Sequence, residues 1–189
     1  MIMVKAIIFD CFGVLTTDKW REFVASLPEC QRQAASDFNR AYGGAHISKA
    51  EFLRSIQELT GRQPQDIDKT LDNETNKNDD LLELIKTLRP KYKIGLLSNV
   101  ASNWIRDHFL SLEEQKLFDN FVFSYEVHIT KPDPDIFKLA ADRLGVVPSE
   151  CILVDDVEYY CGIAQDLGMQ TICYRDFRQT KTELDKLLS

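Results

Sequence analysis

The sequence has neither a long hydrophobic run nor a recognisable targeting segment. No apolar stretch approaches the roughly 20 residues that a membrane helix needs, and the few residues before Asp10 do not form a secretory signal pattern. We therefore expect a cytoplasmic protein that has no membrane partner.

Basic charge and paired cysteines are scarce as well. The formal net charge of -7 provides no basic footprint for nucleic acid. The cysteines number five, an odd count without paired metal-ligand spacing, so we interpret them as reduced, mainly buried residues. A composition of 44% hydrophobic and 28% charged residues is typical of globular proteins and excludes disordered and fibrous classes.

What the sequence does contain is a set of short apolar runs that stop at polar groups. Unbroken apolar runs are typical of buried parallel strands, and open α/β sheets bind ligands beyond the carboxyl ends of their strands. The runs are residues 7–9 before Asp10, 95–97 before Ser98 and Asn99, and 152–154 before Asp155 and Asp156. We expect these polar groups to meet in one crevice, with Lys131 from a fourth segment.

The remaining chain divides by its periodicity. Residues 17–80 have apolar positions at helical spacing, and Ser48 with Glu51 forms a capping-box signature. A polar stretch then ends at Asp79 or Asp80, which we expect to cap a helix over 81–88. From there expected strands (92–97, 121–124, 152–154, 170–174) alternate with helices (103–110, 134–144, a helix ending at 167, a final helix).

This alternation predicts an α/β fold with a doubly wound parallel sheet. Its core comprises residues 1–16 and 81–189, and residues 17–80 form a helical insertion after the first strand, placed to cover the crevice.

Four segments carry a resemblance to a known family. They are residues 7–15 (IIFDCFGVL), 96–99 (LLSN), 130–137 (TKPDPDIF), and 152–156 (ILVDD) continuing to 166–169 (DLGM). In this order they resemble the haloacid dehalogenase-like (HAD) hydrolase superfamily, in the branch with a small helical cap after the first strand. The resemblance implies a Rossmann-like core. Taken singly, each motif also fits a helix cap, a turn or a surface residue.

The resemblance also implies roles for individual residues. Asp10 would attack phosphorus and form an aspartyl-phosphate. Ser98 and Asn99 would bind the phosphoryl oxygens, and Lys131 would neutralise charge and steady Asp10. Oxygen ligands for Mg²⁺ would come from Asp10, the backbone carbonyl of Phe12, and Asp155 or Asp156. The function implied is a Mg²⁺-dependent phosphatase that acts on a small phosphorylated metabolite.

Phe12 departs from the family's pattern. The family's phosphatases usually carry there a second aspartate that protonates the leaving oxygen, and phenylalanine cannot transfer a proton. General acid–base catalysis contributes about 10²–10⁴ in rate, so its loss need not abolish activity. The protein could hydrolyse substrates with good leaving groups, or another residue could donate the proton.

Two other functions stay open. A 2-haloacid dehalogenase would have an aromatic residue at this position, but usually tyrosine, with threonine at Val14 and serines at Asp155 and Asp156. The other possibility is a catalytically weak domain that binds a phosphorylated ligand or a protein. Substrate contacts are expected in the helical insertion, at Tyr42, Gly43, Gly44 and His46.

Overall fold

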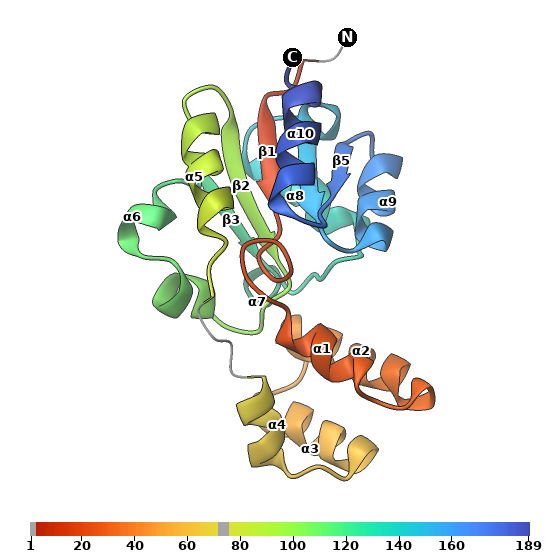
Figure 1. Ribbon diagram of the computed structural model, residues 1–189. Coiled ribbons are helices and arrows are strands. Elements are labelled where there is room, and N and C mark those ends of the chain that lie inside the picture. Colours follow the sequence, from red (N-terminus) through yellow and green to blue (C-terminus); the bar gives the residue numbers. More distant parts are fainter. Residues whose placement is uncertain (1–2, 72–75) are drawn as a thin grey trace.

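A five-stranded parallel sheet forms the centre of the molecule (Figure 1). The computed structural model describes residues 3–71 and 76–189. The strand order is β3-β2-β1-β4-β5, and the bounds are β1 Ala6–Phe9, β2 Lys93–Ser98, β3 Asn120–Phe123, β4 Cys151–Asp155 and β5 Gln170–Cys173. Successive strands run outward from β1 to β3, and the chain then returns to the other side of β1. The predicted doubly wound parallel sheet is confirmed.

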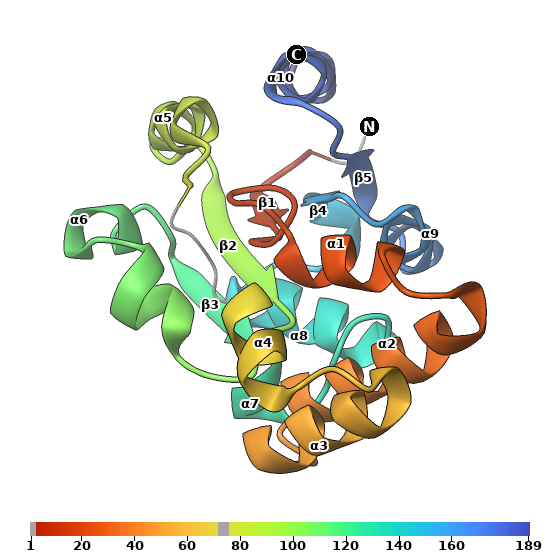
Figure 2. The same cartoon turned by 60° about the horizontal axis from the view of Figure 1, so that its bottom comes forward.

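Apolar side chains alternate between the two faces of the sheet, and helices cover both faces (Figures 1 and 2). On one face Ile7 and Phe9 pack in a core that includes residues of α5 (Asp79–Leu88) and α10 (Phe177–Leu187). On the other face Ile8 packs in a core that includes residues of α8 (Pro134–Arg143) and α9 (Glu158–Asp166). The short elements are η1 (Ile105–Phe109, a π-helix), α6 (Leu112–Gln115), α7 (Ser124–Val127) and η2 (Pro148–Glu150).

The segment after β1 folds into four helices with a small core of their own. They are α1 (Lys19–Ala25), α2 (Glu29–Gly43), α3 (Lys49–Thr60) and α4 (Pro64–Thr70). Phe23, Phe52 and Ile56 are buried among these helices. Ser48 and Glu51 form the expected capping box of α3, whereas α5 is capped by Asn78 rather than by Asp79 or Asp80. Within the described residues, no helix is both long and apolar enough to span a bilayer.

The helical segment lies beyond one end of the sheet and is attached to it by side-chain hydrogen bonds (Figure 1). The hydroxyl of Ser124, which is fully buried, lies 2.7 Å from the carbonyl oxygen of Gly43 at the end of α2. The Ser124 Oγ also accepts a hydrogen bond from the backbone N–H of Val100 at 2.9 Å. His128 Nδ1 lies 3.1 Å from the carbonyl oxygen of Gly44. These contacts hold the carboxyl end of α2 against the sheet.

We expect Ser124→Ala to lower the free energy of unfolding by about 1–3 kcal/mol, because the Val100 N–H and the Gly43 carbonyl lose a buried partner. Urea unfolding measures the change. Thr182→Ala is the control, since its exposed hydroxyl donates only to the Arg178 carbonyl at 2.8 Å. A loss for Ser124→Ala no larger than that for Thr182→Ala would contradict this account.

Candidate active site

The candidate site lies at the carboxyl ends of β1, β4 and β2. Phe9 pairs with Val154 in β4 and with Leu96 in β2, so these strands end at nearly the same level. The backbone N–H of Asp10 donates to the Val154 carbonyl at 2.9 Å and extends the pairing by one step. This register places Asp10 beside Asp155, as expected for polar groups that follow buried parallel strands.

Lys131 joins these two carboxylates through a buried ammonium group. Its Nζ lies 2.9 Å from Asp10 Oδ1 and 2.6 Å from Asp155 Oδ2, and the side chain is only 1% exposed. Burial lowers the pKa of Lys131, but Asp10 and Asp155 together raise it by more, so the net pKa lies above the ordinary value. The group therefore stays charged at any physiological pH.

Asp10 has an unusual electrostatic environment. Burial raises its pKa to about 8, although the Lys131 charge acts in the opposite direction. The backbone N–H of Cys11 donates to Asp10 Oδ1 at 2.7 Å and orients the carboxyl group. A further cation beside Asp10 would favour the ionised, nucleophilic form.

The donor atoms for such a cation are in place. Asp10, Asp155 and Asp156 each offer a carboxylate oxygen, and these oxygens all lie within 4.8 Å of one another. Among the described residues, the buried Oδ1 of Asp156 has no hydrogen-bond partner. Carboxylate oxygens are the ligands that hard divalent cations such as Mg²⁺ prefer. Phe12 has its ring 5.9 Å from that of Trp104, and its carbonyl remains a predicted ligand.

Two residues that the sequence argument did not include fix the position of Asp156. Arg21 of α1 donates through Nη1 to Asp156 Oδ2, although the two residues are 135 positions apart in the sequence. Gly13 has a φ of +83°, and a Cβ there would lie 2.0 Å from Asp156 Oδ2, so only glycine leaves room for this carboxylate. Gly13 lies within a motif and could have been singled out. Arg21 carries no local signal, because only the folded chain brings it to the site.

Ser98 and Asn99 lie at the end of β2 in different surroundings. Ser98 is fully buried, and within the described residues its hydroxyl has no hydrogen-bond partner. Asn99 binds the backbone of Lys131 on both sides: its Oδ1 accepts from the Lys131 N–H at 2.8 Å, and its Nδ2 donates to the Lys131 carbonyl at 3.0 Å. The structure thus places Asn99 where it positions Lys131, a contact that the sequence argument missed.

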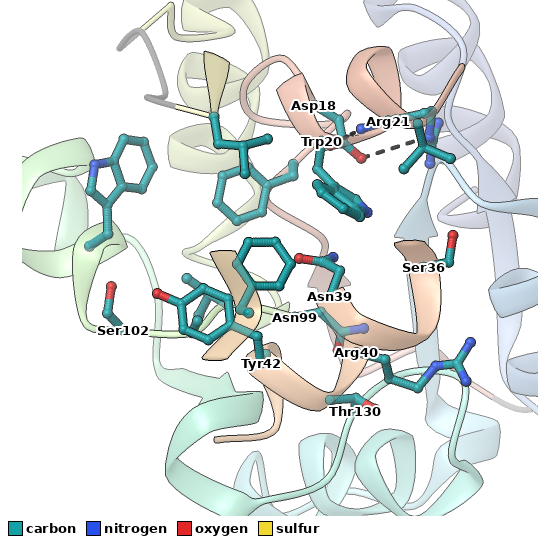
Figure 3. A pocket seen from close by; sticks show the side chains of 18 of the residues that line it. Asp18, Trp20, Arg21, Ser36, Asn39, Arg40, Tyr42, Asn99, Ser102 and Thr130 are labelled. Atoms are coloured by element: carbon teal, nitrogen blue, oxygen red, sulfur yellow. Dashed lines mark hydrogen bonds and ion pairs between the residues drawn. The ribbon is translucent and has the colours of Figure 1, made fainter. Parts of the chain in front are cut away.

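A cavity of about 830 Å³ opens in front of these groups and extends toward the helical segment. Figure 3 shows its wall from α1 and α2, including Asp18, Trp20, Arg21, Asn39 and Tyr42, facing Asn99 and Thr130 from the sheet side. Of the expected substrate contacts in the helical segment, Tyr42 and Gly43 line the cavity. Gly44 and His46 are described but lie outside this lining. Gly44 contacts His128 instead.

Comparison with known proteins identifies a family for this chain. Residues 4–159 match the family model described as haloacid dehalogenase-like hydrolase. The chain belongs to the haloacid dehalogenase-like hydrolases. The family resemblance seen in the sequence is therefore confirmed, and the protein is a HAD-like hydrolase.

Individual relatives cover the chain to different extents. The D-ribitol-5-phosphate phosphatase of Bacteroides thetaiotaomicron is 27% identical over 99% of this chain and 100% of its own length. A HAD family enzyme of the same organism, solved with magnesium and inorganic phosphate, is 26% identical with a TM-score of 0.70, over 94% of this chain and 98% of its own. The bifunctional epoxide hydrolase 2 of Sus scrofa is 35% identical over 64% of this chain, which spans only 22% of that longer protein.

The raised pKa of Asp10 predicts a pH-dependent stability in chelator. The native carboxyl keeps its proton up to about pH 8, whereas an unfolded aspartate loses it near pH ~4. The free energy of unfolding must therefore fall as pH rises between these values. Asp10→Asn has no titrating group at this position, so we expect the free energy of unfolding of Asp10→Asn minus that of the unaltered protein to increase from pH 5 to pH 8 and then level off.

Urea unfolding at several pH values measures this difference. Asp166→Asn, which neutralises an exposed carboxylate of α9, controls for the general removal of one negative charge. A stability difference between Asp10→Asn and the unaltered protein that stays constant from pH 5 to pH 8 would contradict the account.

Proposed function

We propose that this protein is a Mg²⁺-dependent phosphatase that hydrolyses a small phosphorylated compound through an aspartyl-phosphate at Asp10. One observation carries the proposal: the buried Asp10 carboxyl is bonded to the Lys131 ammonium and lies beside the Asp155–Asp156 oxygens at the mouth of a cavity. The phosphatase relative and the magnesium–phosphate complex of the structural neighbour support it.

The donor set fits a magnesium ion. Asp10, Asp156 and the carbonyl of Phe12 would hold it, with Asp155 close by and bonded to Lys131. Mg²⁺ bound there supplies positive charge that lets an anionic carboxylate approach an anionic phosphate. Asp156 Oδ1, buried and without a partner among the described residues, is the oxygen best placed for this purpose.

The protein's own side chains would carry out the other steps of the reaction. An oxygen of Asp10 attacks phosphorus while the bond between phosphorus and the ester oxygen breaks and the leaving group departs with its electron pair. Water then hydrolyses the resulting aspartyl-phosphate, which releases phosphate and restores Asp10. Lys131 screens the charge that gathers between Asp10 and the phosphoryl group. Asn99 keeps Lys131 in place through its two backbone hydrogen bonds. The unpartnered hydroxyl of Ser98 is available to donate to a phosphoryl oxygen once the substrate is bound.

The position of Phe12 shapes the choice of substrate. Its ring contacts Trp104 and lines the cavity, so an apolar surface stands where a proton donor is expected. We therefore propose substrates whose leaving group departs without protonation. The helices of residues 17–80 act in this proposal as a cap, since they provide one wall of the cavity.

Two observations bear on the alternative functions. A halide leaving group needs no metal ion, whereas the three clustered carboxylates offer oxygen ligands for a divalent cation, which favours a phosphate over a haloacid substrate. A binding role without turnover gains support from Arg21, because its guanidinium already neutralises Asp156. Metal-dependent turnover of an aryl phosphate distinguishes an enzyme from a binding protein.

Two substitutions test the proposed roles. We expect Asp10→Asn to abolish Mg²⁺-dependent phosphate release, because an amide cannot act as the nucleophile. Asp156→Ala should weaken Mg²⁺ binding, measured by calorimetry, by at least about tenfold, the equivalent of about 1.4 kcal/mol. Asp142→Asn, an exposed change on α8, is the control for both assays. Full activity in Asp10→Asn would refute the nucleophile, and unchanged affinity in Asp156→Ala would refute the metal ligand.

A third substitution tests competition between Arg21 and the metal. The guanidinium bonds to Asp156 Oδ2 while its side chain remains 48% exposed, so it is free to leave. We expect Arg21→Gln to tighten Mg²⁺ binding severalfold, because the cation no longer has to displace a positive charge. Arg40→Gln is the matched control, since Arg40 also lines the cavity but pairs with Asp37. Weaker Mg²⁺ binding in Arg21→Gln would show instead that Arg21 helps to hold Asp156 for the metal.

A further inference from the structure

The cavity in front of Asp10 is lined by an unusual number of aromatic side chains. Besides Phe52, which is 2% exposed, they are five rings from the segments after β1 and β2, from α9 and from the helical segment, and they include both tryptophans of the sequence: Phe12, Trp104, Tyr160, Trp20 and Tyr42. Each of the five is partly exposed rather than fully buried. Figure 3 shows Trp20 on α1 and Tyr42 on α2 among the side chains that line the cavity. A packed core would cover such rings, whereas these rings keep a surface toward the cavity.

On the sheet side the rings form a short stack next to the nucleophile. Phe12, two residues after Asp10, has its ring 5.9 Å from that of Trp104 at an interplanar angle of 27°. Trp104 in turn stacks on Phe109 at 5.5 Å and 15°. Phe109 is 1% exposed and belongs to the main core. The stack is therefore anchored at its buried end, and Phe12 at its other end lines the cavity together with Asp10.

On the helical side the rings are held in the same way. Trp20 packs against Phe23 at 5.3 Å and against Phe52 at 5.6 Å. Tyr42 stacks on Phe52 at 4.8 Å with an angle of 12°. Phe23 and Phe52 are both 2% exposed. Rings fixed by buried neighbours lose little conformational freedom when they bind a ligand, which makes them good contact surfaces.

From these two walls we propose that the substrate is a phosphate monoester of a planar aromatic alcohol, whose ring packs against Phe12 and Trp104 on one side and toward Trp20 and Tyr42 on the other. The inference rests on the proposed phosphatase function. Aromatic pairs favour offset-stacked or edge-to-face contact, which a flat substrate ring can make with these side chains. An alkyl chain could make apolar contacts with the same rings but not the stacked or edge-to-face geometry that favours an aromatic partner.

The chemistry of Phe12 points to the same substrate class by a separate route. Asp10 forms a bond to phosphorus while the bond between phosphorus and the aryl oxygen breaks, and the electron pair of that bond goes to the aryl oxygen. A phenol has a pKa near 10, as in tyrosine, so the aryl oxide leaves without a proton from the protein and takes one from water. Water then hydrolyses the aspartyl-phosphate, which releases inorganic phosphate and restores Asp10.

Three probes separate ring recognition from leaving-group quality. With saturating Mg²⁺, 1-naphthyl phosphate has a ring and a good leaving group, acetyl phosphate has a good leaving group and no ring, and D-ribitol 5-phosphate has neither. We expect the highest kcat/KM for 1-naphthyl phosphate. Trp104→Leu should lower the ratio of kcat/KM for naphthyl phosphate to that for acetyl phosphate about fivefold, mainly through KM. Tyr159→Leu, which changes a 64% exposed aromatic residue outside the cavity lining, should leave the ratio unchanged.

Binding without turnover gives a second readout. Because both tryptophans line the cavity, naphthyl phosphate should change the tryptophan fluorescence of Asp10→Asn saturably, and acetyl phosphate should not. If Trp104→Leu does not fold, Trp20→Leu gives the same comparison from the other wall. Faster turnover of D-ribitol 5-phosphate, or an unchanged substrate ratio in the folded tryptophan variant, would overturn the aromatic proposal alone. Absence of Asp10-dependent hydrolysis of all three probes would overturn the proposed function with it.

Discussion

The ammonium group of Lys131, buried between Asp10 and Asp155, is the interaction on which the site depends. A buried charge is tolerated only when partners compensate it, and removing one partner leaves the other uncompensated. Here the two carboxylates come from the ends of adjacent strands, and Asn99 fixes the lysine backbone from the end of a third. The pairing of the strands therefore also determines how the charged groups of the site are placed relative to one another.

The same arrangement explains why the Lys131 ammonium alone does not balance the charge of the three clustered carboxylates. Lys131 bonds to Asp10 and Asp155 but leaves Asp156 to other groups, and Arg21 fills that position from the helical segment. Burial, reinforced by the charges of Asp155 and Asp156, raises the pKa of Asp10 to about 8 even though Lys131 acts in the opposite direction. A divalent cation among these oxygens would complete the charge balance and make the Asp10 carboxylate available as a nucleophile.

Much of this arrangement could be predicted from the sequence, because it depends on local patterns. The apolar runs that stop at polar residues predicted the positions of β1, β2 and β4. They also predicted that Asp10 lies close to Asp155 and Asp156. The capping box at Ser48 was also visible in the sequence. The cap of α5 was not, because Asn78 competes with two neighbouring aspartates for the same role and local sequence does not decide between them.

The contacts that sequence reasoning missed all join distant segments. Arg21 reaches Asp156 across 135 positions, and Asn99 reaches Lys131 across 32. The aromatic lining of the cavity likewise combines rings from the segments after β1 and β2 and from α1, α2 and α3 with Tyr160 of α9. Apolar periodicity alone would assign these rings to a core. Only the packed structure shows that they keep a surface toward a cavity.

Chemical trapping of the covalent intermediate tests the central claim most directly. The protein is mixed with 1-naphthyl or acetyl phosphate and Mg²⁺ and quenched in acid during turnover. One part of the sample is mapped by mass spectrometry directly, and the other part after borohydride reduction of any acyl phosphate. The account predicts a phosphoryl group on the peptide that contains Asp10, and conversion of Asp10 to homoserine on reduction. Turnover with an unmodified Asp10 peptide, or with phosphoryl on another residue, would contradict it.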